Sequence, residues 1–151
     1  MRVWRLCFSR FAVPNGEGAR LYGGRWNLPG TAVIYTSATL SLAALELLTH
    51  TDSDLMPRNL VAVVAEIPKH LDIEEMSQAD LPDNWVAYPP PEAVQILGTR
   101  WVEREDTAVL SVPSVIIFDE RNYLLNPKHP DFGQIRWSNP TPFTWDPRLY
   151  K

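Results

Sequence analysis

Residues 23–46, GGRWNLPGTAVIYTSATLSLAALE, predict a glycine-rich turn, a short strand and an apolar helix in immediate succession. The turn contains Arg25, the strand over 32–36 carries Tyr35, and the helix carries a single acid, Glu46. An arginine, an aromatic ring and a carboxylate thus come from three elements that are adjacent in the sequence. If these side chains converge, they form a small-molecule site that can hold an anion and stabilise a developing positive charge.

The helix that follows the strand is apolar almost all round. Ser37 or Thr39 can cap its N-terminus, and it is expected to run to about His50. One face carries Leu40, Ala43, Ala44, Leu47 and Leu48, and the opposite side carries Leu42, Leu45 and Glu46. We therefore expect a largely buried helix, in which an ionised glutamate is costly without a partner. The alternative is a helix edge from which Glu46 reaches water; the nearby arginines favour a carboxylate that faces a cleft.

The composition excludes several classes of protein. A chain of 151 residues that is 45% hydrophobic and 21% charged is typical of one globular domain, here residues 1–151. The net charge of -4 argues against a protein that binds the nucleic-acid backbone. The single cysteine, Cys7, excludes an internal disulfide, and the sequence has no Cys/His cluster at zinc spacing. No apolar run approaches the ~18 residues of a membrane helix, and the N-terminal MRVWRLCFSRF is interrupted by arginines. These features predict a cytoplasmic protein without a metal, with small molecules and other proteins as partners.

The remaining pattern predicts a β-rich fold with short elements, because the 14 prolines lie mostly between periodic segments. Strands are expected over 2–8, 60–67, 108–112, 115–118 and 122–126, a helix over 92–104, a loop over 14–24, and an aromatic strand in the tail PFTWDPRLY. In the first strand Arg5 shares a face with Val3 and Cys7, which leaves open whether it reaches solvent from an edge. Pro113 breaks the pairing before Ser114, so this serine is expected at a bend with a free hydroxyl. No nucleophile motif surrounds it.

Four segments, taken together and in order, resemble the RES-domain family, which is named for an arginine, a glutamate and a serine: GARLYGGRWNLPGTAVIYTSATLSLAALELLTH, LGTRWVE, LSVPSVIIFDERNYLLNPKHPDF and PFTWDPRLY. The resemblance spans essentially the whole chain and is loosest over 68–91. It implies an α+β fold similar to that of ADP-ribosyltransferase toxins, with flanking helices around a split β-sheet cleft. It also implies a toxin of a bacterial toxin–antitoxin pair that consumes NAD+ by hydrolysis or phosphorolysis of the nicotinamide–ribose bond. The implied partner is a Xre-type antitoxin, one part of which covers the active site while another part binds DNA. The implied toxin is a homodimer within the larger toxin–antitoxin complex.

The resemblance also implies roles for individual residues. The family arginine falls on Arg25, the aromatic on Tyr35, the glutamate on Glu46 and the serine on Ser114, and these form the implied catalytic set. Glu46 is expected to stabilise the cationic sugar, and Ser114 to hold Glu46 or Arg25 through a hydrogen bond. The residues expected to contact NAD+ are Arg5 and Arg25 at the phosphates, Tyr35 at the nicotinamide, and Trp26, Asn27 and Asn122 around them. Trp26 is better explained as packing beneath the arginine, and Asn122 as a turn residue that reaches the site.

Two other functions share these residues. A protein ADP-ribosyltransferase has the same cleft but a different acceptor, and a non-catalytic NAD-binding module keeps the cleft without turnover. The intact set of Arg25, Tyr35 and Glu46 counts against the second. Whether water, phosphate or a protein accepts the ADP-ribose is not encoded in any motif of the chain.

Overall fold

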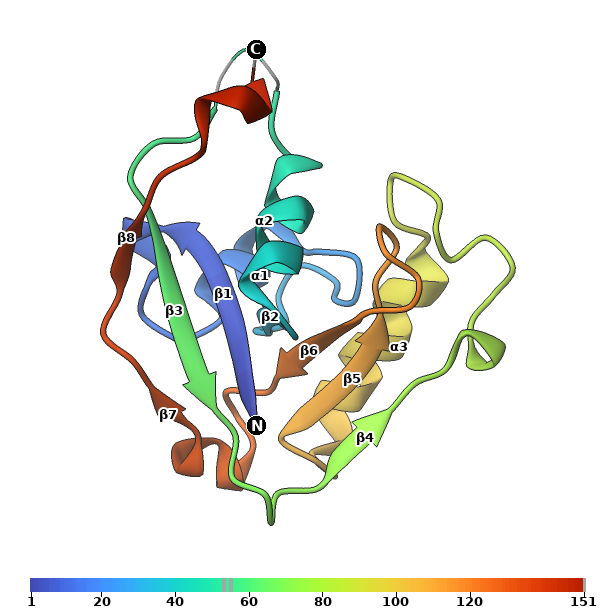
Figure 1. Ribbon diagram of the computed structural model, residues 1–151. Helices are drawn as coiled ribbons and strands as arrows, with labels where there is room; N and C mark the ends of the chain where they lie inside the picture. The colour runs from blue at the N-terminus through green and yellow to red at the C-terminus, as the bar shows by residue number, and fades with distance from the viewer. Residues whose placement is uncertain (53, 55, 151) are drawn as a thin grey trace.

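A mixed β-sheet forms the centre of the computed structural model, which describes residues 1–52, 54 and 56–150. Within these residues the sheet has eight strands in the order β4-β5-β6-β2-β1-β3-β7, with β8 also paired to β3 (Figure 1). The strands are β1 Arg2–Phe8, β2 Ile34–Ser37, β3 Leu60–Glu66, β4 Ile73–Glu75, β5 Val109–Pro113, β6 Arg121–Leu125, β7 Arg136–Trp137 and β8 Thr141–Phe143. β4 and β5 pair in parallel, and the other strand pairs among the described residues are antiparallel. The expected α+β fold is confirmed.

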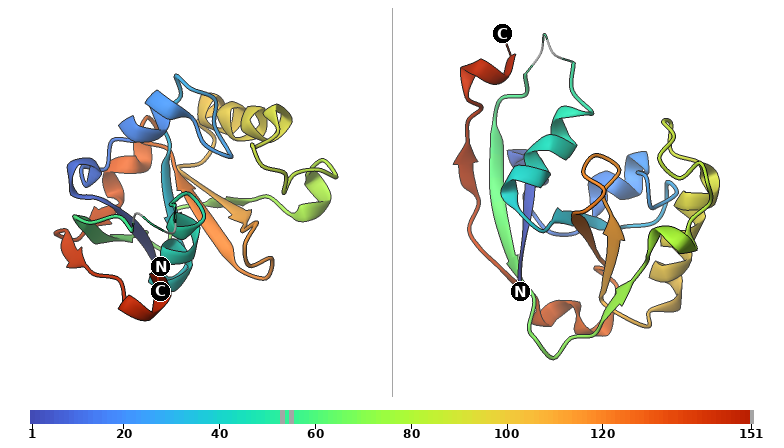
Figure 2. Two further views of the ribbon diagram at one scale, coloured as in Figure 1. Left: turned by 90° about the horizontal axis from the view of Figure 1, so that it is seen from above. Right: turned by 45° about the vertical axis from the view of Figure 1, so that its right-hand side comes forward.

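The sheet divides into two halves between β1 and β2. These strands are paired at a single position, Trp4 opposite Ser37, whereas β1 and β3 are paired along seven consecutive positions. In both views of Figure 2 the orange strands β5 and β6 stand apart from the blue and green strands β1 and β3. The split sheet that the resemblance implies is therefore present.

One helix packs over the division of the sheet and another on the half that contains β5 and β6. The helices are α1 Glu17–Tyr22, α2 Leu40–Leu48 and α3 Glu92–Arg104, with short 3-10 helices at Ser9–Phe11, Gln78–Asp80, Pro130–Gln134 and Pro147–Tyr150. α2 packs against β1 and β2 through a cluster that includes Leu6 and Ala43. α3 packs on β5 and β6, where Trp101 is fully buried. Within the described residues no helix combines the length and hydropathy that crossing a bilayer requires.

The strand over 2–8, the strand that begins at residue 60 and the helix over 92–104 are confirmed, and Thr39 caps α2 as one of the two expected caps. The expected loop over 14–24 is wrong, because it contains the six-residue helix α1. The Asn15 side chain accepts the Glu17 N–H at the start of this helix, and Glu17 forms an ion pair with Arg20 inside it. Gly23, with φ of 71°, ends the helix in a conformation that favours glycine.

The strand expected over 115–118 is also wrong. Pro113 is the last residue of β5, and residues 114–120 form a loop closed by a Ser114 N–H donated to the Glu120 carbonyl. The Ser114 hydroxyl oxygen accepts the N–H groups of Ile116 and Ile117, so the backbone donors of this segment serve a turn instead of a ladder. The apolar run therefore lies partly on the surface, where Phe118 is exposed.

Three further expectations are corrected. The aromatic strand expected in the tail is reduced to β8, because residues from Pro147 onward form a 3-10 helix; Lys151 lies outside the described residues. In α2 only Leu42 and Ala43 are buried and Leu45 is 40% exposed, since one side of the helix remains in solvent. β1 lies between β2 and β3, so Arg5 does not stand on a sheet edge.

Candidate functional site

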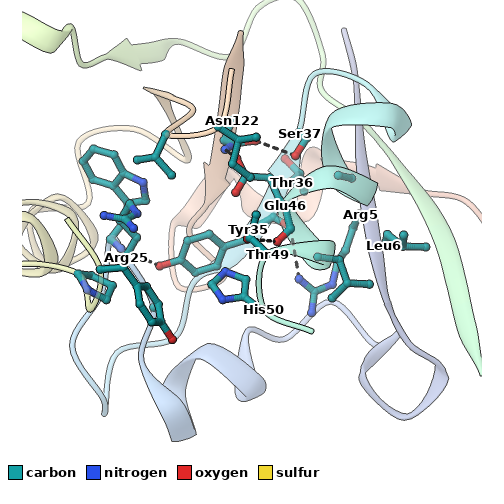
Figure 3. Close-up of a pocket in the computed structure, with 18 of the residues that line it drawn as sticks. Arg5, Leu6, Arg25, Tyr35, Thr36, Ser37, Glu46, Thr49, His50 and Asn122 are labelled. Atoms are coloured by element: carbon teal, nitrogen blue, oxygen red, sulfur yellow. Dashed lines mark hydrogen bonds between the residues drawn. The ribbon is translucent and has the colours of Figure 1, made fainter. Parts of the chain in front are cut away.

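A pocket of about 750 Å³ opens where the sheet splits (Figure 3). Its walls come from β1, β2, α2, the turn after α1, the segment before α3, and the loop between β5 and β6. Small-molecule sites in proteins typically enclose about 300–1,000 Å³. The volume is therefore suited to a ligand as large as a dinucleotide, and the rest of the geometry shows what chemistry the walls offer.

The Glu46 carboxylate projects from α2 into this pocket and is held through one of its two oxygens. Ser114 donates its hydroxyl to Oε1 at 2.9 Å, and Asn122 donates its side-chain amide to the same oxygen at 2.6 Å. Oε2 accepts no hydrogen bond from the described residues. The carboxylate is thus fixed in orientation with one oxygen left for a ligand. The Ser114 hydroxyl, expected to be free, is fully engaged, and the expected contact between Ser114 and Glu46 is present.

Asn122 is itself oriented by Ser37, which the sequence indicated only as an alternative cap for α2. Ser37 lies directly opposite Asn122 in the pairing of β2 with β6. Its hydroxyl donates to the Asn122 side-chain oxygen at 2.7 Å, which turns the amide nitrogen toward Glu46. Ser37 is 4% exposed, so water competes little for this bond. Asn122 thus lies in strand β6 and not in a turn as expected, and its side-chain amide orients the Glu46 carboxylate.

The turn that carries Arg25 is docked on α3. The Gly24 N–H donates to the Asn27 carbonyl at 3.1 Å, so Arg25 lies at the tip of a tight turn. From α3, Gln95 donates to the Gly24 carbonyl at 3.0 Å. Gly98 of the same helix lies against the Trp26 backbone, where a Cβ atom would be only 1.8 Å from the Trp26 carbonyl oxygen. The glycine in the middle of α3 is therefore required by this close approach.

The Arg25 guanidinium joins the turn to the segment before α3. Its Nη1 donates to the Trp85 carbonyl at 2.8 Å and to the Ala87 carbonyl at 2.9 Å. Burial lowers the pKa of Arg25, and the charge of Glu46 opposes that shift. An arginine with this partner set stays charged at neutral pH, so the pocket holds a fixed cation near its carboxylate.

The Tyr35 side chain crosses from β2 to the same turn. Its hydroxyl donates to the Asn27 side-chain oxygen at 2.5 Å and accepts the Trp26 N–H at 3.0 Å. Burial raises the pKa of the Tyr35 hydroxyl far above its usual range. This hydroxyl is thus a neutral structural group, while the residue also forms part of the pocket wall. Gly24 makes the contact possible, since a Cβ atom there would be 2.6 Å from the tyrosine oxygen.

Arg5 supplies a second guanidinium from β1. Its Nη1 donates to the Tyr35 carbonyl at 3.3 Å, and its Nε is buried without a hydrogen-bond partner. Arg5 also forms part of the pocket wall. Because Nε is inaccessible, an anionic ligand is bound by the terminal N–H groups of this guanidinium.

The structure brings Arg5, Arg25, Tyr35, Glu46 and Asn122 to one pocket, but it separates Asn27 from it. Asn27 is completely buried, and its amide nitrogen donates to the carbonyls of Ala19, Leu28 and Thr31. This residue, expected to contact NAD+, lies behind the Tyr35 hydroxyl and supports it. Trp26, 3% exposed, forms the base of the pocket wall and packs in the core beneath α3.

The sequence did not indicate the outer part of the pocket. His50 extends the wall past the end of α2, and its ring centre lies 6.4 Å from that of Tyr88. Tyr88 and Tyr22 are both more than three-quarters exposed and line the pocket from different segments. A single exposed aromatic residue, in a loop or at the end of a short helix, carries no periodic signal, so only the folded chain reveals it. In residues 1–52, 54 and 56–150 no three His, Cys, Asp or Glu side chains are grouped so as to hold a metal ion.

The pocket thus combines one oriented carboxylate, two guanidinium groups and several aromatic faces. Guanidinium groups bind phosphate oxygens, aromatic faces stack on planar rings, and a carboxylate stabilises a neighbouring positive charge. This combination fits a ligand that contains phosphates, aromatic bases and a carbon centre at which positive charge develops.

The chain is similar to known proteins along nearly its whole length. Residues 2–146 match a family model described as the RES domain. The chain is 36% identical over 139 residues to the Prs ADP-ribosylating toxin of Sphingobium sp. (strain YBL2), with 91% of this chain and 86% of that protein covered. It is 37% identical over 152 residues to Toxin Res of Yersinia enterocolitica, with 99% of each covered. Among solved structures it is similar to a chain of the M. tuberculosis MbcT–MbcA toxin–antitoxin complex, with a TM-score of 0.75, 19% identity, and 99% of this chain and 86% of that chain covered. The last comparison is a likeness of fold alone.

Proposed function

This chain belongs to the RES domain family, and on that premise we propose that it is the toxin of a toxin–antitoxin pair and cleaves the nicotinamide–ribose bond of NAD+. The observation that carries the proposal is the Glu46 carboxylate, oriented by Ser114 and Asn122 in the pocket that also holds Arg5 and Arg25. The remaining walls supply the other contacts that a dinucleotide needs.

The chemistry of this bond matches what the pocket offers. The bond between C1′ of the ribose and N1 of nicotinamide breaks with both electrons moving to the nitrogen, so the pyridinium leaves as neutral nicotinamide. The sugar becomes an oxocarbenium-like cation, and negative charge fixed beside it lowers the barrier. The unengaged oxygen of Glu46 supplies that charge. Because the leaving group departs uncharged, the reaction does not require the Tyr35 hydroxyl, which is held neutral by burial, as a proton donor.

The two guanidinium groups hold the pyrophosphate in this proposal. Arg5 lines the pocket and donates its terminal N–H groups to one phosphate. Arg25 keeps Nη1 on the Trp85 and Ala87 carbonyls and turns its other edge to the second phosphate. Tyr35 offers its ring to nicotinamide. Asn122 acts here as a positioning residue for Glu46, and Asn27 as a positioning residue for Tyr35.

Either of two acceptors, water or inorganic phosphate, completes the reaction, and no further reactant is needed. Water attacks C1′ and releases a proton to solvent to give ADP-ribose, or inorganic phosphate attacks to give ADP-ribose-1″-phosphate. A second candidate, transfer of ADP-ribose to a protein, is favoured by one observation: a relative that is 36% identical is named as an ADP-ribosylating toxin.

The test is to incubate the purified chain with NAD+, with and without inorganic phosphate, and to measure free nicotinamide by chromatography. Glu46→Gln is the matched control, because glutamine keeps an oxygen for Ser114 and Asn122 but removes the negative charge. We expect a loss of at least about 100-fold in kcat with an unchanged melting temperature. A wild-type protein that releases no nicotinamide under either condition refutes the proposal. Transfer of radiolabelled ADP-ribose to proteins of a lysate identifies the second candidate.

We also propose that an antitoxin binds this chain at the mouth of the pocket. The structural relative was solved as a toxin–antitoxin complex, and the mouth of the present pocket is lined by exposed Tyr22, Val86 and Tyr88. A Xre-type antitoxin that covers this mouth would bury these side chains and block NAD+. A toxin homodimer within a larger complex stays a prediction, which light scattering on the co-expressed pair would measure.

A further inference from the structure

The outer wall of the pocket is formed by residues 85–88. Its backbone is held in place although the segment before α3 is irregular. Trp85 is 7% exposed, and its ring lies 5.9 Å from that of Phe118. The carbonyls of Trp85 and Ala87 are both bound by Arg25. The backbone from residue 85 to residue 87 is therefore anchored at two points, and the side chains that follow are presented from a defined position.

Tyr88 is presented at this wall beside His50. It is 76% exposed and lines the pocket. The His50 ring, which comes from beyond the end of α2, lies 6.4 Å away and is tilted by 53°. Two rings from distant parts of the chain thus stand close together at the outer part of the pocket, and neither is used by the reaction proposed above.

Arg25 connects this wall with the rest of the pocket. Its Nη1 donates to the carbonyl of Ala87, the residue directly before Tyr88, and the charge of Glu46 acts on its guanidinium. The pocket thus offers a carboxylate, a guanidinium and an exposed aromatic ring. A dinucleotide has a complementary part for each of them: the reacting sugar, the pyrophosphate and the second base.

We propose that Tyr88, with His50 beside it, forms a stacking subsite for the base that is distal to the bond cleaved, the purine of the dinucleotide. This inference rests on the proposed function and deepens it, because it assigns the part of the substrate that distinguishes a dinucleotide from a mononucleotide. A tyrosine ring stacks on a planar base in an offset or parallel arrangement. The subsite contributes to binding and leaves the bond-breaking step to Glu46.

The experiment compares NAD+ with nicotinamide mononucleotide, which has the same scissile bond but no second base. For Tyr88→Ala we expect KM for NAD+ to rise by about 5- to 150-fold, the range given by removal of one base–aromatic stack. The kcat for NAD+ and the kinetics with the mononucleotide should change by less than about 2-fold. Tyr88→Phe, which keeps the ring, should restore the wild-type KM. Tyr150→Ala, an exposed tyrosine outside this pocket, is the matched control.

Binding of ADP-ribose, measured by calorimetry, gives a readout that does not depend on turnover. It retains the purine and lacks nicotinamide, so Tyr88→Ala should raise its Kd by the same factor as KM. An unchanged Kd, or an effect in Tyr22→Ala in place of Tyr88→Ala, overturns the inference while the proposed reaction stands. A wild-type protein that binds ADP-ribose through Tyr88 but releases no nicotinamide refutes the proposed reaction and leaves the subsite.

Discussion

Replacement of Gly98 by alanine tests the contact between α3 and the turn that carries Arg25. The added Cβ would lie 1.8 Å from the Trp26 carbonyl oxygen and 2.8 Å from its carbonyl carbon. Both are backbone atoms, so no side chain can rotate away, and the helix or the turn must move by roughly 1 Å or more. Overpacking of this kind costs about 1–3 kcal/mol and occasionally more, against a gain of about 1 kcal/mol in helix propensity. Because both contacts are to backbone atoms inside a packed cluster, we place the overpacking cost above that range, at about 3–5 kcal/mol, which leaves a net loss of about 2–4 kcal/mol.

The loss is measured by urea denaturation followed by tryptophan fluorescence. For a domain of this length, 2–4 kcal/mol corresponds to a decrease in melting temperature of roughly 5–15 °C. Gly133→Ala is the matched control, because a Cβ there meets nothing within 4 Å, and it should change the free energy of unfolding by less than about 1 kcal/mol. If Gly98→Ala is as stable as the wild type, α3 does not hold the turn in the way described.

Three further changes test other contacts of the site. Ser114→Ala removes a hydrogen bond to a carboxylate, so kcat for nicotinamide release should decrease by about 10- to 100-fold, and an unchanged kcat would remove Ser114 from the positioning of Glu46. Arg25→Lys cannot reach both carbonyls of the 85–87 segment, so hydrogen exchange of that segment should accelerate by about 10-fold or more, while exchange of β3 stays constant. The raised pKa of Tyr35 means that the unfolded chain loses this proton first, so the free energy of unfolding should decrease as pH rises above about 10. Tyr35→Phe should reduce that slope in urea titrations at pH 9 and pH 11; an identical slope would contradict the assignment.

The sequence was most informative where the site is local. Arg25, Tyr35 and Glu46 lie within 22 consecutive residues, and their turn, strand and helix are read from glycines, β-branched residues and apolar periodicity. Their convergence follows from adjacency, because consecutive elements usually pack on one another. The family resemblance added Ser114, whose contact with Glu46 spans 68 residues of sequence.

The rest of the site depends on pairings between distant segments, which periodicity does not encode. Ser37 orients Asn122 only because β2 and β6 are neighbours in a register that places the two residues opposite each other. Asn27 lies in the turn that was expected to bind the ligand. Its side-chain amide instead donates hydrogen bonds to three backbone carbonyls that stabilise the turn. The run 115–118 has the composition of a strand, and the hydroxyl of Ser114 diverts its backbone donors into a loop. In each case a specific polar contact overrides the local preference.

The divided sheet and the position of Glu46 have a consequence for synthesis of the chain. Glu46 is carried by α2, which packs mainly on β1, whereas its two donors, Ser114 directly after β5 and Asn122 in β6, come from the other half of the sheet. A nascent chain that has not yet emerged beyond Asn122 has the carboxylate but neither the strand β6 nor the closed loop that orients it. We therefore expect every fragment that ends before residue 122 to be inactive. Under the proposed function, activity begins only once about four-fifths of the chain has been made, so an antitoxin that binds the emerging chain acts before the site is complete.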